Sequence, residues 1–131
     1  MNIITESLIL KRDFYSEKGA SLEVIKKAED DIGVKFADDY KECLMKYGAV
    51  SCSGHDLTGV SSNKNLDVVN ITLLNRKKNP KVNNKFYVVE ETHLDGIVVW
   101  QTTNGEIFQT EYKEEPVKIY NSLVEYIESF T

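Results

Sequence analysis

Several things are missing from this chain of 131 residues, and each absence narrows what the protein can be. No apolar run approaches the ~20 residues that a membrane-spanning helix needs. The segment from Met1 to Glu6 lacks the basic stretch and apolar core of a secretory signal, so we expect a cytoplasmic protein. The 2 cysteines fit free thiols in that compartment. Without an internal repeat or a long linker, residues 1–131 are expected to form a single domain.

Charge is spread unevenly along the chain, whose net charge is −5. Residues 90–131, the acidic third, carry nine acidic and only two basic side chains. Residues 48–89 carry six basic and two acidic side chains, so the middle of the chain is positive. A field of one sign steers partners of the opposite sign and speeds their association. For any single carboxylate, a solvated surface role is the plainer interpretation.

Two short helices joined by a tight turn are predicted between residues 21 and 48. Ser21 is a suitable N-cap for the first helix, and Gly33 follows it where a left-handed residue is favoured. The second helix is expected to start near Phe36 and to end at Gly48. Asp38 and Asp39 lie in its first turn, where negative charge suits the helix dipole. The apolar stripes of the two helices are Val24, Ile25, Ala28 and Ile32, and Tyr40, Leu44 and Tyr47.

The same segment resembles the SUKH superfamily, whose usual signature is "I..aE..lG..LP.dy..fL..yG". The residues that carry the resemblance are Ile25, Ala28-Glu29, Ile32-Gly33, Phe36-Ala37, Asp39-Tyr40, Leu44 and Tyr47-Gly48. One departure is Ala37, which stands where the family usually has proline. The run from Val68 to Arg76 is similar to the family's next segment, with Asp67 as a possible cap for a short helix. The resemblance spans about Ser21 to Phe130.

Three strand-like runs follow, with turn signals between them. They are Phe86–Val89, Ile97–Trp100 and Ile107–Thr110. Asp95-Gly96 and Asn104-Gly105 precede the second and third runs, and both dipeptides favour hairpins because they accept positive φ. The resemblance also implies a strand meander here. We therefore predict an α+β fold: an antiparallel meander packed with the N-terminal helical hairpin and a C-terminal helix.

The remaining segments have weaker patterns. A helix over Ile4 to Tyr15 is expected, with Leu8 and Phe14 inward. Residues 51–65 and 76–85 are expected to be loops, the first with a short strand at Asp56 to Val60 and the second basic. A C-terminal helix is predicted from the capping pair Ser122 and Glu125, with Leu123, Tyr126, Ile127 and Phe130 buried.

No group of residues predicts catalysis, so we expect a protein that is not an enzyme and uses no cofactor. Cys43, Cys52, His55 and His93 could supply four zinc ligands, but structural zinc sites usually show two paired clusters. A Cys–His nucleophile at Cys52 and His55 lacks a third group to orient the imidazole. Glu90 and Glu91 should point to opposite faces of a strand. There is no glycine-rich phosphate loop, and Trp100 is expected in the core.

Direct binding of nucleic acid is also not expected. Arg76, Lys77, Lys78 and Lys81 form a short basic patch, whereas useful affinity for phosphate backbones rests on several spaced cations. A solvated loop explains the patch more simply.

What remains is a small acidic binding module, to which the SUKH resemblance gives a role. The family that this chain resembles includes bacterial immunity proteins, which neutralise secreted polymorphic toxins, many of them nucleases. Other members of the family are regulatory scaffolds. The resemblance thus implies an immunity protein that binds a cognate toxin domain and occludes its active site. The alternative is an intracellular regulatory scaffold that binds a housekeeping protein, and a cysteine-dependent hydrolase is a third possibility. Neither membrane binding nor an oligomeric state is indicated.

Charge complementarity with a basic toxin would place the partner surface among carboxylates of the acidic third. The candidate residues in that segment are Glu90, Glu91, Asp95, Glu106, Glu111, Glu114 and Glu115. Since strand neighbours alternate between faces, turn and strand-end positions are the better candidates. The predicted partner-binding residues are therefore Asp95, Glu106, Glu111, Glu114 and Glu115.

Overall fold

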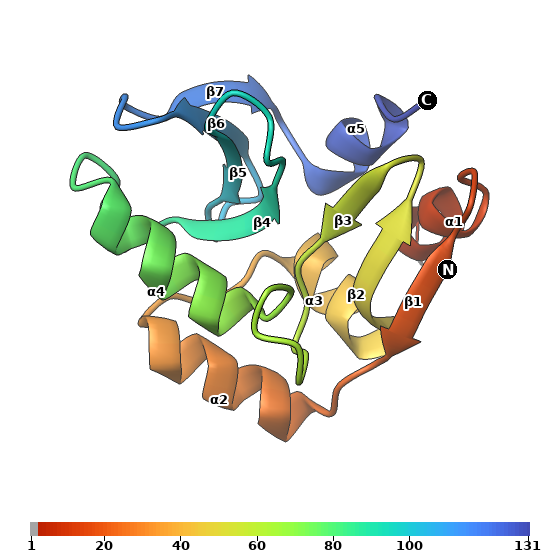
Figure 1. Cartoon of the computed structure of the whole chain (residues 1–131). Helices are drawn as coiled ribbons and strands as arrows, with labels where there is room; N and C mark the ends of the chain where they lie inside the picture. The colour runs from red at the N-terminus through yellow and green to blue at the C-terminus, as the bar shows by residue number, and fades with distance from the viewer. Residues whose placement is uncertain (1–2) are drawn as a thin grey trace.

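The computed structural model describes residues 3–131 as five helices and one antiparallel sheet of seven strands, ordered β1 to β7 as in the chain (Figure 1). The predicted α+β class is confirmed, with helices from both ends of the chain flanking the sheet. No helix in this described part is long and apolar enough to cross a membrane. In chain order the elements are α1 (Ile3–Ile9), β1 (Tyr15–Lys18), α2 (Leu22–Ile32), α3 (Asp38–Lys46), β2 (Tyr47–Cys52), β3 (His55–Leu57), α4 (Val68–Lys78), β4 (Tyr87–Glu91), β5 (Ile97–Gln101), β6 (Ile107–Glu111), β7 (Val117–Tyr120) and α5 (Leu123–Glu128).

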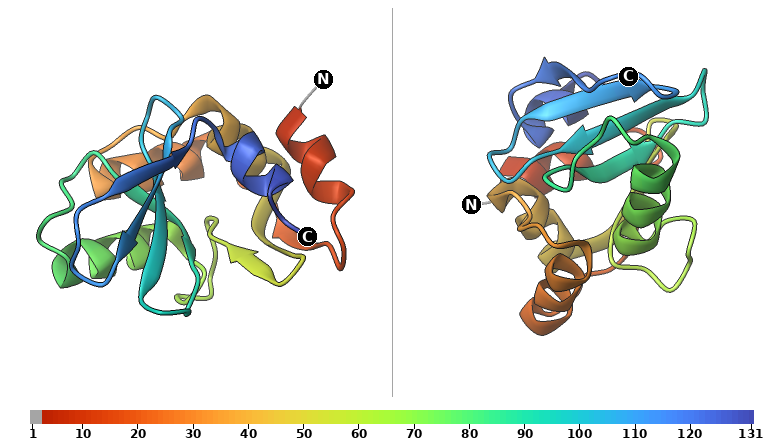
Figure 2. Two further views of the ribbon diagram at one scale, coloured as in Figure 1. Left: turned by 90° about the horizontal axis from the view of Figure 1, so that it is seen from above. Right: turned by 90° about the vertical axis from the view of Figure 1, so that its left-hand side faces the viewer.

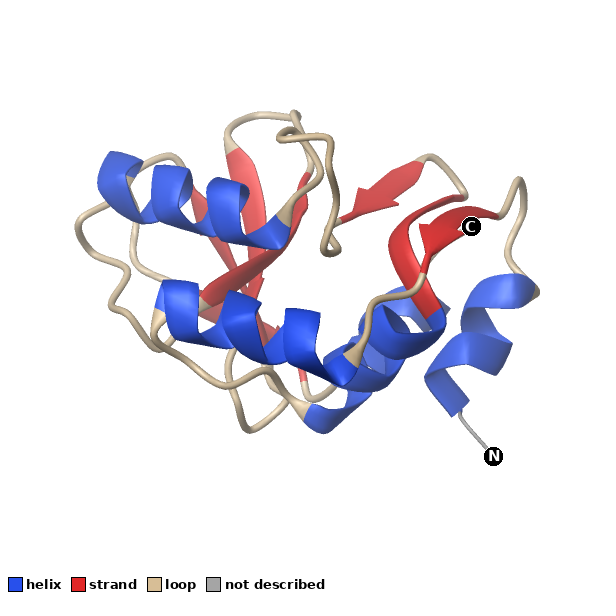
Figure 3. Cartoon of the chain, turned by 90° about the horizontal axis from the view of Figure 1, so that it is seen from below, coloured by secondary structure: helices blue, strands red, loops and turns tan. Residues whose placement is uncertain are grey.

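Both faces of the central strands are covered. The main core joins α1, α2, α3 and α5 to one face, and it includes Val89 and Val99. A smaller core under α4 covers the other face of β4 and β5, with Val88 and Trp100 in it. Trp100 is 1% exposed, so its predicted place in the core is confirmed. Figure 3, which views the chain from below, shows α4 and α2 side by side in front of the strands.

The predicted helical hairpin forms with the expected caps at its first helix. The hydroxyl of Ser21 accepts a hydrogen bond from the Val24 amide, and Gly33 ends α2 with φ of 72°. Val24, which the sequence places in the apolar stripe of this helix, is 43% exposed, and of that stripe only Ile25, Ala28 and Ile32 are buried. The second helix ends at Lys46 and not at Gly48, because Tyr47 and Gly48 already belong to β2, where Tyr47 pairs with Lys18.

The N-terminal helix is shorter than predicted. Leu8 is buried as expected, but α1 ends at Ile9, and Asp13 takes a positive φ of 57°. Tyr15–Lys18 instead forms β1 against β2. Phe14 is only partly buried, with its ring edge-on to Tyr47 at 5.0 Å between centroids. Pairing with a distant strand overrides a weak helical pattern here.

Two predicted loops contain regular structure. Ser51 and Cys52 belong to β2, and the expected short strand at Asp56 lies at His55–Leu57. The short helix predicted after Asp67 runs on to Lys78, so the first part of the basic loop is helical. Asp67 caps this helix as predicted, accepting from the Asn70 amide. The sequence patterns did not reveal β7.

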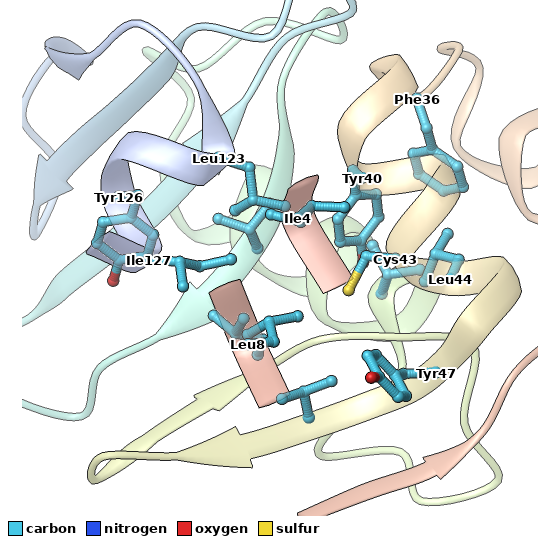
Figure 4. Packing of buried hydrophobic residues seen from close by; sticks show 14 of the residues in the cluster. Ile4, Leu8, Phe36, Tyr40, Cys43, Leu44, Tyr47, Leu123, Tyr126 and Ile127 are labelled. Atoms are coloured by element: carbon cyan, nitrogen blue, oxygen red, sulfur yellow. The ribbon is translucent and has the colours of Figure 1, made fainter. Parts of the chain in front are cut away.

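α1 and α5 close the main core from the two ends of the chain (Figure 2). Figure 4 shows Ile4 and Leu8 of α1 lying between side chains of α5 and α3, among them Leu123, Ile127 and Leu44. The C-terminal helix has the predicted cap: Ser122 Oγ accepts from the Glu125 amide at 3.1 Å.

A buried polar network links the layers at Tyr87, whose side chain is fully buried. The Tyr87 hydroxyl accepts from the Ala37 amide at 2.8 Å and donates to Gln101 Oε1 at 2.7 Å. Gln101 Nε2 then donates to Asp39 Oδ1, and Asp39 Oδ2 accepts from the Leu123 amide at 2.9 Å. One network therefore holds α3, β4, β5 and α5. A proline at position 37, which the signature that this segment resembles usually has, would have no N–H to donate.

Arg76 fixes α4 to the neighbouring segments. Its guanidinium donates to the backbone carbonyls of Ile32, Asn84 and Phe86, the shortest bond being 2.7 Å to Ile32. Burial lowers the pKa of Arg76 from its usual value. This member of the basic patch is therefore engaged inside the protein.

Removing the hydroxyl of Tyr87 should weaken the fold more than its size suggests. Tyr87→Phe leaves the buried Ala37 N–H and Gln101 Oε1 without their partner, so urea unfolding should show a loss of about 2–3 kcal/mol. Tyr120→Phe is the control, because Tyr120 is half-buried and its hydroxyl makes no hydrogen bond with any residue in 3–131. Equal stability losses in the two variants would contradict the role of the network.

Candidate functional site

Four of the five predicted partner-binding carboxylates gather at one end of the sheet. Asp95 lies in the turn before β5, and Glu111 ends β6 opposite Ile97. Glu114 and Glu115 follow in the connection to β7. The Tyr112 amide donates to the Gly96 carbonyl at 2.9 Å, which brings the two connections together. All four carboxylates are exposed and make no ion pair among residues 3–131.

Glu106 lies apart from these four residues. It precedes β6, at the opposite end of that strand from Glu111. Its carboxylate accepts from Lys118 Nζ at 2.8 Å. The structure therefore does not bring Glu106 into the same surface.

Glu90 is not available to a partner. It is 3% exposed, and its carboxylate accepts from the Tyr126 hydroxyl and lies 3.0 Å from His55 Nδ1. Glu91 accepts from Asn75 Nδ2 at 2.7 Å, on the face that α4 covers. The prediction that these two neighbours point to opposite faces is confirmed. Since β4 has an irregular register between Val88 and Glu90, Val89 and Glu90 both face the main core.

Two exposed apolar side chains stand among the four carboxylates, and sequence reasoning missed both. Leu94 is 68% exposed and Tyr112 is 69% exposed. Tyr112 has a φ of 54°, which bulky residues rarely adopt. Its ring lies over Gly96, where any Cβ would come within 2.5 Å of it. An isolated leucine inside a polar turn was the available signal for Leu94. We call Leu94, Asp95, Glu111, Tyr112, Glu114 and Glu115 the acidic surface.

A groove of about 750 Å³ opens beside the acidic surface. We call it the α4 groove, because the C-terminal half of α4 forms one wall. Its apolar lining includes Ile97, Val98 and Trp100, and its charged lining includes Lys77, Lys78, Lys113, Glu91 and Glu114. Asn79 at the end of α4 donates to the carbonyls of Tyr112 and Glu114, which fixes the β6–β7 connection above that end of the helix (Figure 1).

Of the cysteine and histidine candidates, His93 lines the α4 groove, whereas Cys43, Cys52 and His55 lie elsewhere. Cys52 and His55 face each other across the β2–β3 hairpin and not in an open loop, and Glu90 supplies the orienting group that sequence reasoning lacked. His55 also stacks on Phe130, with centroids 3.7 Å apart. The thiol is nevertheless poorly placed for attack: Cys52 is 1% exposed, and burial, with help from Glu90, raises its pKa.

Cys43 is also inert by the same criteria. It is buried on α3, and burial raises its pKa to about 12. The thiolate, which is the nucleophile and the metal ligand, is therefore disfavoured at both cysteines. Within residues 3–131 no three His, Cys, Asp or Glu side chains are close enough to hold a metal ion.

Both thiols should therefore resist modification in the folded protein. A disulfide reagent at pH 8 should label Cys43 and Cys52 slowly, and both should react at once in denaturant, where their pKa returns to about 8.5. Cys52→Ser should leave partner binding unchanged. Rapid labelling of one thiol in the native state would contradict this account and would support a cysteine-dependent activity.

Comparison with known families identifies the class of the protein. The chain matches the family model SUKH_6, described as SMI1-KNR4 cell-wall, over residues 22–127. This match covers most of the chain and shows that the protein belongs to the SUKH superfamily. Membership suggests a protein-binding domain of the immunity or regulatory kind. No curated protein matches the chain.

Proposed function

We propose that this SUKH domain is an immunity protein that binds a cognate secreted polymorphic toxin, a nuclease, and neutralises it in the cytoplasm by occlusion. The observation that carries the proposal is the acidic surface: two large exposed apolar side chains, Leu94 and Tyr112, surrounded by four carboxylates that make no ion pair with any other described residue. Apolar groups at the centre and charges at the rim are the arrangement that protein interfaces use.

The two parts of the acidic surface would contribute differently. Buried aromatic and apolar anchors carry most of the binding energy at interfaces, whereas rim charges mainly set the association rate. A nuclease domain presents basic residues to its nucleic-acid substrate. Carboxylates that imitate the charge of that substrate would guide this face of the toxin onto the acidic surface, and Tyr112 and Leu94 would then hold it there.

Occlusion requires no chemistry from the immunity protein. The carboxylates would cover the toxin residues that otherwise contact phosphates, so the toxin could not admit its substrate. Fast capture matters in this role, because free toxin would damage the cell that makes it. Family membership and the four exposed carboxylates of the acidic surface support this proposal together.

Reversing the charge of the acidic surface should slow association. The variant Asp95→Lys/Glu111→Lys/Glu114→Lys/Glu115→Lys should bind the toxin encoded beside this gene at least about tenfold more slowly at low salt, with a flatter salt dependence and little change in folding. Glu106→Lys is the single-site comparison and should change the rate less. Stopped-flow measurements at low and high salt would check this.

If the four-site variant associates as fast as the parent at low salt, the acidic surface is only a solvated face. If the parent binds no neighbouring toxin at all, the alternative of a regulatory scaffold for a housekeeping protein takes precedence.

Truncating the apolar side chains at the centre of the acidic surface should make the toxin dissociate faster. Tyr112→Ala and Leu94→Ala should each raise the dissociation rate, with Tyr112→Ala costing about 2 kcal/mol of binding free energy as expected for an aromatic hot spot. Leu10→Ala is a matched control, because Leu10 is 84% exposed and lies just after α1. Equal dissociation rates for Tyr112→Ala and Leu10→Ala would exclude Tyr112 from the interface.

A further inference from the structure

A second hollow adjoins the α4 groove. Its volume is about 290 Å³, and it lies between β3, the loop over residues 61–67 and the start of α4. Glu91 and His93 line both spaces, so the groove and the hollow meet at these residues. The hollow's other lining residues are Asp56, Thr58, Asn63, Asn65, Leu66 and Ile71. We call this space the Asp56 hollow.

The Asp56 hollow and the α4 groove form one continuous space, and the hollow is its negatively charged end. Leu57 pairs with Glu90 in the antiparallel β3–β4 ladder, and the next residue along each strand, Asp56 on β3 and Glu91 on β4, lines the hollow. Like charges close together on paired strands are destabilising unless a cation lies between them. Within residues 3–131, Asp56 has no ion pair, and no lysine or arginine pairs with Glu91, whose carboxylate lies 4.0 Å from His93 Nε2. No lysine or arginine lines the hollow.

The far end of the α4 groove has the opposite charge. Lys77 and Lys78 come from the last turn of α4, where positive charge suits the helix dipole, and Lys113 comes from the β6–β7 connection. All three are exposed, and none makes an ion pair with another residue in 3–131. Glu114 at the rim is the one carboxylate at this end. Between the two charged ends, Ile97, Val98 and Trp100 form an apolar part of the lining.

The separation of the two ends fits a short stretch of extended chain. Ile71 lines the Asp56 hollow and Lys78 lines the far end of the groove. Seven residues of helix span ~10 Å at 1.5 Å each. An extended chain covers that distance in about three residues at ~3.3 Å each.

From this charge order we propose that the α4 groove and the Asp56 hollow form one channel for an extended segment of the partner protein. The segment has a cationic residue for Asp56 and Glu91, an acidic residue for the lysines about three positions away, and an apolar residue between them. This inference rests on the proposed function, since the segment belongs to the partner that covers the acidic surface. Charge complementarity selects this occupant, because a polyanion would meet the two carboxylates and a purely cationic segment would meet the three lysines.

Blocked tetrapeptides can test the channel without any toxin. The three probes are Arg-Leu-Ala-Glu, Arg-Leu-Ala-Arg and Glu-Leu-Ala-Glu, each acetylated and amidated. In ¹H–¹⁵N spectra at physiological salt, millimolar Arg-Leu-Ala-Glu should shift the amide resonances of Glu91, His93, Val98 and Thr110. It should bind about threefold to fivefold more tightly than either like-charged peptide, the effect of one partly exposed ion pair.

Variants at each end locate the binding. Asp56→Asn/Glu91→Gln keeps an acceptor for Asn75 but removes both charges, and it should weaken Arg-Leu-Ala-Glu about threefold to fivefold. Lys78→Gln/Lys113→Gln should do the same from the other end. Glu23→Gln/Glu128→Gln is the matched control, because it removes two exposed carboxylates from α2 and α5 and should change nothing.

The proposal is overturned if millimolar Arg-Leu-Ala-Glu shifts no channel resonance, if Arg-Leu-Ala-Arg binds best, or if the control variant weakens binding as much as the channel variants do. Toxin binding separates the two proposals. A toxin that binds the parent and the two channel variants equally well removes the channel and leaves the proposed function standing. If the peptide binds in the channel but the protein binds no toxin, the channel stands and the proposed function is removed.

Discussion

The buried hydroxyl of Tyr87 is the constraint on which the arrangement of layers depends. It lies between the first turn of α3 and the centre of the sheet, and it accepts from Ala37 while it donates to Gln101. Gln101 and Asp39 extend the network to α5. Apolar packing alone would let the helices slide over the sheet, whereas buried donors and acceptors must meet their partners at fixed positions. The network thus fixes where the helices sit on β4 and β5.

Because the network fixes β4 and β5, it also supports the connections at the ends of these strands. β4 and β5 hold one connection of the acidic surface, and β6 leads into the other. His93, Asp95 and Tyr112 all have positive φ, of 53–58°. Such conformations are costly and persist where the surrounding structure enforces them, which is common at binding sites. Hydrogen bonds from Asn79 to the β6–β7 connection add to this support. Leu94 and Tyr112 are therefore presented on a fixed frame, which reduces the entropy lost on binding.

Short-range sequence signals were enough to predict much of the fold. Caps at Ser21, Gly33, Asp67 and Ser122, and the dipeptides Asp95-Gly96 and Asn104-Gly105, are short-range features that a sequence reveals. The errors fall where distant pairing decides the outcome, as at β1, where Tyr15–Lys18 joins β2. For the candidate site, the sequence indicated an acidic end but not which carboxylates meet: Glu90 is buried and Glu106 pairs with Lys118. The apolar centre and the meeting of Asp56 and Glu91 at the hollow depend on strand register, which no local pattern encodes.

The most direct test of the account is hydrogen exchange of the protein alone and in complex with the toxin encoded beside its gene. The account predicts that binding slows amide exchange at residues 92–97 and 111–117 and at the C-terminal end of α4, and that it leaves α1 and the β1–β2 pair unchanged. Protection confined to α1, α5 and the β1–β2 pair would contradict the account, because these elements lie on the other side of the domain from the acidic surface (Figure 1).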